Sequence, residues 1–210
     1  MTRDPGNVLL KTLCLLPLIP ALAFPGVGVL ASLIIVVLVL LFVKASRGPT
    51  LAMRHRSIPV SVALGLVFGV MVTLVFGLLI EPVIERVTGE PLDLTALGGI
   101  EGDVRGFLLL LALGLLFGGV VEEVIFRGYL VGWGAALFGP GAGLWLCLLS
   151  ASVFGISHIY QGITGVLTTG LIGLCFGLFY LWTNRRLLPV IVAHMTVNAF
   201  GVTALFLGVG

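Results

Sequence analysis

Two adjacent carboxylates and an arginine interrupt a long apolar stretch near the middle of the chain: Glu122, Glu123 and Arg127. A charged side chain at the centre of a membrane-spanning helix costs about 2.5 to 3.5 kcal/mol on insertion scales, so this cluster indicates a function. On a helix, Glu123 and Arg127 share one face and can form an ion pair. Glu122 then remains as a free carboxylate that can act as a general base or acid.

Two further pairs of residues lie in apolar stretches later in the chain. His158 follows Phe154 by four positions and Asn198 follows His194 by four, so each pair shares one face of a helix. Phe154 can form a wall of a pocket beside His158, whereas His194 and Asn198 present an imidazole and an amide to one point. A lone histidine or asparagine in a membrane helix more often forms a hydrogen bond between helices than takes part in catalysis. Together with the carboxylates, they favour a functional site.

The composition of the chain is that of an integral membrane protein. Of 210 residues, 59% are hydrophobic and 10% are charged, and the mean hydropathy is +1.25. The apolar stretches have helical length and lack the alternation of β-strands, which predicts an all-α, polytopic transmembrane helical bundle. The net charge of +2 carries no nucleic-acid signal. Cys14, Cys147 and Cys175 lack CxxC spacing and are interpreted as packing residues.

About seven spans, within a range of six to eight, are predicted in one membrane domain: residues 8–24, 27–43, 58–80, 106–138, 144–160, 163–182 and 187–207. The first follows Arg3 and Lys11 but is interrupted by Pro17 and Pro20, so a retained span is favoured over a signal peptide. Residues 1–104 are predicted to form the N-terminal helices with an extracytoplasmic acidic loop, and residues 105–210 the helical core that carries the candidate functional residues.

Charges in the loops predict the orientation in the plasma (cytoplasmic) membrane. The densest basic loop, residues 44–57, and the turn at Arg185 and Arg186 are expected in the cytoplasm. Six of the nine acidic residues lie in residues 81–105, which we place outside, and Asp4 is terminal. Only Glu122 and Glu123 are therefore left within the membrane.

The depth of the candidate residues follows from the rise of a helix. His194 lies about 10 Å and His158 roughly 20 Å along helices that start at the cytoplasmic side. Glu122 lies between them. The sequence therefore predicts a site that is buried below the cytoplasmic surface and opens toward it.

The motifs E-E-x-x-x-R, F-x-x-x-H and H-x-x-x-N, taken in this order on successive helices, resemble those of the CPBP family of intramembrane proteases. This family includes the type II CAAX prenyl proteases and bacteriocin-processing or self-immunity proteins. The resemblance covers about residues 105–203. Each motif alone is weak, whereas the three in order are quite specific.

The resemblance implies hydrolysis of a peptide bond in a membrane-associated protein or peptide. Glu122 and His158 would activate a water molecule, and His194 and Asn198 would stabilise the oxyanion. Glu123 and Arg127 would hold the helix in register.

A zinc enzyme is the competing mechanism, with Glu122, His158 and His194 as ligands and water in the fourth position. No H-E-x-x-H motif is present. The sequence therefore leaves two options for the cofactor, none or a single zinc ion.

Two functions without proteolysis stay open. Buried carboxylates can serve as the relay of a proton- or ion-coupled transporter or a subunit of one, although the expected internal repeat is absent. A member of the family can also act by binding, as an immunity or scaffold protein. The expected partners are a membrane-associated peptide or protein substrate and the lipid bilayer, and no nucleic acid.

Overall fold

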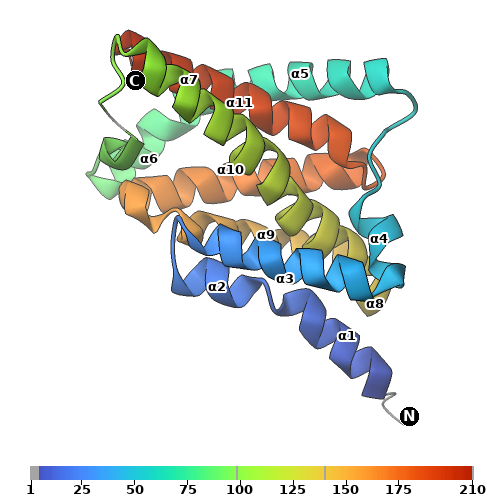
Figure 1. Cartoon of the computed structure of the whole chain (residues 1–210). Coiled ribbons are helices and arrows are strands. Elements are labelled where there is room, and N and C mark those ends of the chain that lie inside the picture. The colour runs from blue at the N-terminus through green and yellow to red at the C-terminus, as the bar shows by residue number, and fades with distance from the viewer. Residues whose placement is uncertain (1–4, 98, 140, 210) are drawn as a thin grey trace.

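The computed structural model describes residues 5–97, 99–139 and 141–209, so that Arg3 and Asp4 lie outside the described part. These residues form helices, with no β-strand among them (Figure 1), which confirms the all-α prediction. In chain order, with η for 3-10 or π-helical segments, they are α1 (Pro5–Leu15), α2 (Leu18–Ala23), α3 (Gly28–Phe42), α4 (Lys44–Thr50), α5 (Ile58–Val75), η1 (Phe76–Ile80), α6 (Glu81–Thr88), η2 (Thr95–Leu97), α7 (Val104–Leu113), η3 (Gly114–Glu122), η4 (Val124–Trp133), α8 (Gly134–Phe138), α9 (Ala142–Ser157), η5 (Ile159–Gln161), α10 (Gly162–Trp182) and α11 (Leu187–Leu207).

The number of membrane spans differs from the prediction. In the described part of the chain, four helical stretches are long and apolar enough to cross a membrane: Ile58–Thr88, Val104–Phe138, Ile159–Trp182 and Leu187–Leu207. A fifth is obtained if α3 and α4, which meet at an angle of 120°, count as one bent span. The count of about seven is not confirmed, because the apolar helices Val8–Ala23 and Ala142–Ser157 are shorter, at 10–17 residues.

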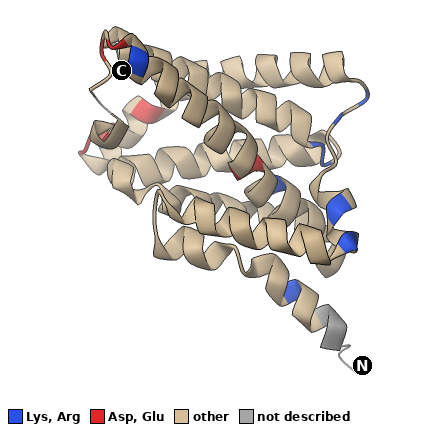
Figure 2. Ribbon diagram, in the orientation of Figure 1, with Lys and Arg blue, Asp and Glu red and all other residues tan. Residues whose placement is uncertain are grey.

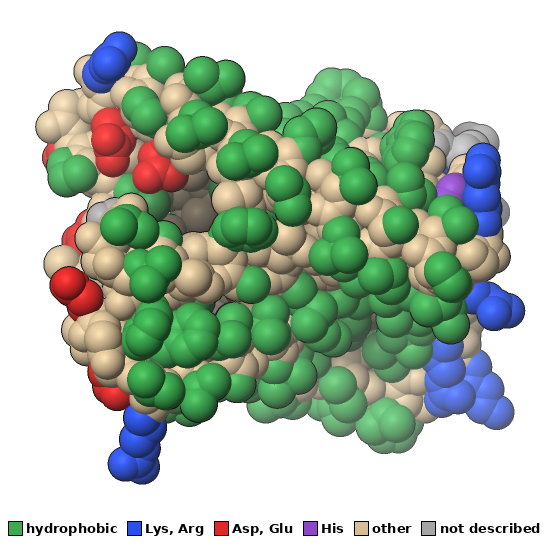
Figure 3. All heavy atoms as spheres, turned by 90° about the horizontal axis from the view of Figure 1, so that it is seen from above, with side chains coloured by type: hydrophobic (Ala, Val, Ile, Leu, Met, Phe, Trp, Pro, Cys, Tyr) green, Lys and Arg blue, Asp and Glu red, His purple; other side chains and the backbone are tan. Residues whose placement is uncertain are grey.

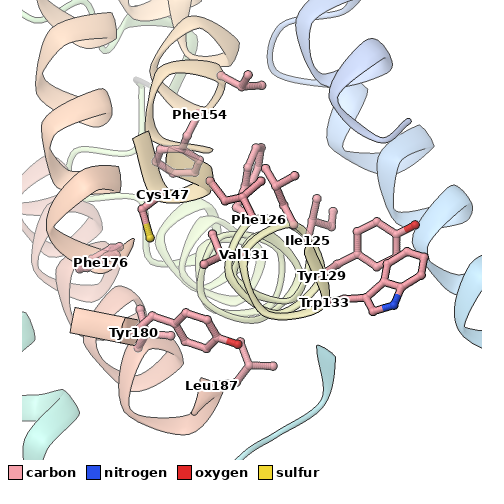
Figure 4. Close-up of a cluster of buried hydrophobic side chains, with 14 of the residues drawn as sticks. Ile125, Phe126, Tyr129, Val131, Trp133, Cys147, Phe154, Phe176, Tyr180 and Leu187 are labelled. Carbon is pink, nitrogen blue, oxygen red and sulfur yellow. The ribbon is translucent and has the colours of Figure 1, made fainter. Parts of the chain in front are cut away.

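The helix that carries the carboxylates runs through the centre of the bundle. It continues from Val104 to Phe138 but is π-helical in η3 and η4, on both sides of Glu123. Such wider turns are frequent at functional sites. Residues 125–135 are all buried, and Figure 4 shows their side chains radiating from this helix into a cluster with those of α9, α10 and α11.

One end of the bundle is basic. The loop at residues 44–57 meets the turn before α11, where the Leu187 amide donates to the Ala52 carbonyl oxygen at 2.8 Å. Arg185 and Arg186 come directly before Leu187 in the chain. Most lysines and arginines gather at this end of the bundle (Figure 2). We call it the basic end.

The opposite end is acidic and carries most of residues 81–105. The Asp93 amide donates to the Gln161 carbonyl oxygen at 3.2 Å, and the Gly102 amide donates to the Phe206 carbonyl oxygen at 3.0 Å. Figure 3 shows apolar side chains covering the flank between the two ends, as expected for a surface that faces lipid. Charge asymmetry predicted from the loops is therefore present in the fold.

Two glycines of α5 bring it close to α11, the helix that carries His194. A Cβ atom added at Gly65 would lie 2.5 Å from the Pro189 carbonyl oxygen, and one added at Gly69 would lie 2.7 Å from that of Ala193. Small residues at this spacing allow backbones of membrane helices to approach closely. Gly65 and Gly69 therefore let α5 pack directly against α11.

Candidate active site

Arg127 is buried and held from several sides. Its Nη1 donates to Glu123 Oε1 at 2.8 Å, as the spacing of four residues predicts, and both side chains are 0% exposed. Its Nη2 donates to the Gly173 carbonyl oxygen at 2.7 Å. The guanidinium carbon lies 5.0 Å from the ring centre of Phe154 and 5.6 Å from that of Phe176. These contacts compensate for burial of the charge.

Glu123 has a second partner, which the sequence reasoning missed. His194 Nδ1 lies 2.7 Å from the Glu123 Oε1 atom that already accepts from Arg127. Because an ionised carboxylate only accepts hydrogen bonds, Nδ1 must carry the proton. Glu123 thus orients the imidazole as well as binding the arginine. No local signal reveals this contact, since the two residues are 71 positions apart.

Glu122 is the carboxylate of the pair that remains reachable. Its side chain is 15% exposed, against 0% for Glu123, and its Oε2 lies 3.9 Å from His194 Nε2. No hydrogen bond joins Glu122 to His158 in the part of the chain that the structure describes. Glu122 is therefore the carboxylate that can meet a substrate.

His158 lies directly after the last residue of α9. Its Nδ1 lies 2.7 Å from the Phe154 carbonyl oxygen, an acceptor, so this nitrogen donates. Among the described residues, none forms a hydrogen bond with His158 Nε2. The Phe154 ring stands 4.7 Å from the His158 ring and 6.0 Å from the His194 ring, centre to centre. Phe154 therefore lies against both imidazoles, in keeping with the predicted wall.

Asn198 lies against the π-helical segment η3. Its Nδ2 donates to the Gly114 carbonyl oxygen at 2.9 Å, which uses one of the two amide protons. A Cβ atom added at Gly118 would collide with the Asn198 amide and lie 3.6 Å from His194 Nε2. The absence of a side chain at Gly118 therefore leaves room for the Asn198 amide at the site itself.

The reachable part of the site lies toward the acidic end. His158 is followed by η5, which accepts a hydrogen bond from Asp93 through Gln161. On the other side of Glu122, the helix continues toward the basic end through residues 125–135, which include Arg127 and are all buried. The surface is hollowed beside the acidic side chains (Figure 3). The predicted opening of the site toward the cytoplasm stays a prediction, because the structure contains no membrane that would orient the bundle.

The residues proposed as zinc ligands do not meet as a metal site. In both His158 and His194, Nδ1 forms a hydrogen bond with an oxygen acceptor. Metal-binding histidines typically use one ring nitrogen in this way and the other, here Nε2, for the metal. Nevertheless, within residues 5–97, 99–139 and 141–209, no three His, Cys, Asp or Glu side chains are placed to hold a metal ion. The positions of Glu122 and the two histidines therefore do not form a ready three-ligand site in the described part of the chain.

Fold and site together define a polytopic membrane protein with acid–base groups and hydrogen-bond donors gathered inside its helical bundle. Residues 104–200 match the family model described as "Type II CAAX prenyl endopeptidase Rce1-like". The match covers just under half of the chain, contains all three motifs and confirms the resemblance to the CPBP family. The comparisons with curated proteins and with solved structures give no match.

Proposed function

We propose that the protein is an intramembrane endopeptidase that hydrolyses a peptide bond of a membrane-associated protein or peptide. The observation that carries this proposal is the grouping of one reachable carboxylate, Glu122, with two oriented imidazoles, His158 and His194. The match of residues 104–200 to an endopeptidase family supports it. In this proposal residues 105–210 form the catalytic core.

Glu122 and His158 are the proposed activators of water. With its proton on Nδ1, His158 offers a lone pair on Nε2, and Glu122 offers its carboxylate. Water attacks the scissile carbonyl carbon while its proton passes to Glu122. The carbon–nitrogen bond then breaks, and Glu122 returns the proton to the leaving amine.

Asn198 and His194 are the proposed donors to the oxyanion. Asn198 has one amide proton left after its bond to η3. His194 Nε2 can donate only in the imidazolium form, because Nδ1 donates to Glu123. In that form, the positive charges of His194 and Arg127 balance the two negative charges of Glu122 and Glu123. A cluster of charged groups can be buried at low cost only when its charges balance in this way.

The membrane side of the site depends on the orientation of the bundle. We propose that the basic end faces the cytoplasm, from the excess of lysine and arginine there. The reachable residues lie toward the acidic end. A substrate would then reach Glu122 from the outer side or from within the bilayer.

A cleavage assay on the purified protein tests the proposed function. Detergent-solubilised protein is incubated with membrane-anchored peptides, with and without chelator, and its metal content is measured. Wild type should cleave, Glu122→Gln should not, and Glu90→Gln should retain activity, because Glu90 is an exposed carboxylate at the acidic end. Equal turnover by wild type and Glu122→Gln would remove Glu122 from the mechanism. Binding of the peptides without cleavage by wild type would favour the scaffold alternative.

A further inference from the structure

We propose that the basic end contains a binding site for the phosphate of an anionic phospholipid, separate from the candidate active site. An open cavity of about 820 Å³ lies there. It is lined by residues of the loop before α5 and of the turn before α11, among them Arg54, His55, Arg56, Asn184 and Arg186. None of the proposed catalytic residues is among the residues that line the cavity.

The charge of this cavity is uncompensated. Arg54, Arg56 and Arg186 line it, and no acidic residue is among the lining residues. In the described part of the chain, no ion pair involves any of the three arginines. Guanidinium groups bind phosphate oxygens in a bidentate manner, so three of them around one cavity suit a phosphate group.

The backbone around the cavity adopts an unusual conformation. Arg56, Asn184 and Arg185 have φ of 57°, 57° and 58°, and they are the non-glycine residues with positive φ in the described part of the chain. Such left-handed residues persist where the surroundings hold them and cluster at ligand clamps. A loop that serves only to orient the protein needs positive charge but no particular shape. The conformation therefore points to a binding role.

Two helices begin at the cavity and add to its positive potential. Ile58 is the first residue of α5 and Leu187 that of α11. The positive ends of the two helix dipoles favour an anion through their charge, because the first two amides of α11 already have backbone acceptors. Hydrogen bonds hold the two rims together: the Leu187 amide donates to the Ala52 carbonyl oxygen and the Leu188 amide to that of Met53. The cavity is therefore held in shape by its own backbone.

A phospholipid suits this cavity better than free phosphate does. Apolar side chains share the lining with the arginines, and two of them, Met53 and Ile58, are 44% and 57% exposed. Figure 3 shows the basic side chains at the edge of the apolar flank, which is the position of headgroups in a bilayer. Basic pockets between membrane helices on the cytoplasmic side bind anionic headgroups. The arginines would hold the phosphate while the apolar rim contacts the acyl chains.

The test measures the melting temperature of the full-length protein in detergent during titration with phosphatidylglycerol, phosphatidylcholine or inorganic phosphate. Phosphatidylglycerol should raise the melting temperature of wild type. Phosphatidylcholine and inorganic phosphate should not. Arg54→Gln with Arg186→Gln should weaken the apparent affinity for phosphatidylglycerol about fivefold for each arginine removed.

The matched control combines Lys44→Gln with Arg105→Gln, which removes two exposed positive charges outside the cavity and should leave the affinity unchanged. A third variant, Arg56→Gly, removes one guanidinium and suits the left-handed backbone, so it stays folded if the double variant does not. It should also bind phosphatidylglycerol about fivefold more weakly than wild type does.

The same affinity for phosphatidylglycerol in the cavity variants as in wild type would overturn the proposal. An equal effect of phosphatidylcholine or of inorganic phosphate would also overturn it.

Discussion

Glu122 and Glu123 are neighbours in the chain with different surroundings. Glu123 is fully buried and accepts hydrogen bonds from Arg127 and His194 through one oxygen. Glu122 is partly exposed, and its Oε2 lies at the longer distance of 3.9 Å from His194 Nε2. Substituting each in turn therefore separates a supporting role from a chemical one.

Glu122→Gln should abolish turnover and leave the melting temperature nearly unchanged, because the amide keeps the shape and loses the proton chemistry. Glu123→Gln should instead destabilise the protein by about 3 to 5 kcal/mol, since it leaves Arg127 as an unpaired buried charge. Turnover and thermal unfolding in one detergent measure both effects. Equal destabilisation by the two changes, with activity per folded molecule retained in Glu122→Gln, would contradict the assignment.

Asn198→Ala should lower kcat by about a hundred- to a thousandfold with little change in KM if the amide stabilises the oxyanion. Its bond to Gly114 accounts for a loss of about 0.6 kcal/mol of stability on average. Thr203→Ala is the matched control, because Thr203 lies on the same helix, is exposed and bonds only the Ala199 carbonyl oxygen. An unchanged kcat in Asn198→Ala would leave the residue a structural role only.

His194→Ala separates the two mechanisms that involve this imidazole. If His194 binds zinc, the variant should lose bound metal while Asn198→Ala keeps it. If His194 is an oxyanion donor, wild type should be equally active before and after chelation, and His194→Ala should lose kcat. Metal content and single-turnover rates measured on the same preparations decide between these results. Activity that disappears on chelation and returns with zinc would contradict the metal-free mechanism.

Two glycines of the π-helical segment η3, Gly114 and Gly118, lie against the Asn198 side chain. Replacing a helical glycine by alanine where space allows stabilises a protein by about 0.4 to 1 kcal/mol. Gly114 has such space, since an added Cβ atom would lie 3.7 Å from its nearest neighbour, Asn198 Cβ. At Gly118 the same atom would collide with the Asn198 amide. Two glycines one turn apart thus offer a matched pair of variants.

Gly118→Ala should therefore displace the Asn198 amide and lower kcat, whereas Gly114→Ala should retain activity and raise the melting temperature. Cleavage kinetics and thermal unfolding of both variants in the same detergent provide the measurement. The interpretation fails if Gly118→Ala is as active as Gly114→Ala. It also fails if the loss of activity in Gly118→Ala merely follows a loss of folded protein.

The two ends of the bundle differ in charge, and this difference predicts how the bundle is oriented in the membrane. A membrane-impermeant maleimide applied to intact cells should label Glu90→Cys at the acidic end and leave Lys44→Cys at the basic end unlabelled. Both positions are exposed, and the variants are made in a background without Cys14, Cys147 and Cys175. The opposite labelling pattern would reverse the orientation and turn the reachable side of the site to the cytoplasm.

The sequence by itself determined the local features of this protein. Mean hydropathy determines that the chain is a helical membrane protein, and loop charges determine which ends are basic and acidic. The spacing of four residues determines that Glu123 can pair with Arg127, because one helical turn brings these side chains together whatever the rest of the chain does. Motif order also predicted the family that residues 104–200 match.

Only the tertiary structure decided how these parts meet. The hydrogen bond between His194 and Glu123 joins residues 71 positions apart, and that between Asn198 and Gly114 joins residues 84 apart. Neither contact follows from helical periodicity, since each depends on how closely α11 packs beside η3. The burial of residues 125–135, which follow Glu122 along the same helix, likewise depends on how the neighbouring helices pack against this segment. A pattern along one helix describes the faces of that helix, whereas a site between helices depends on their packing.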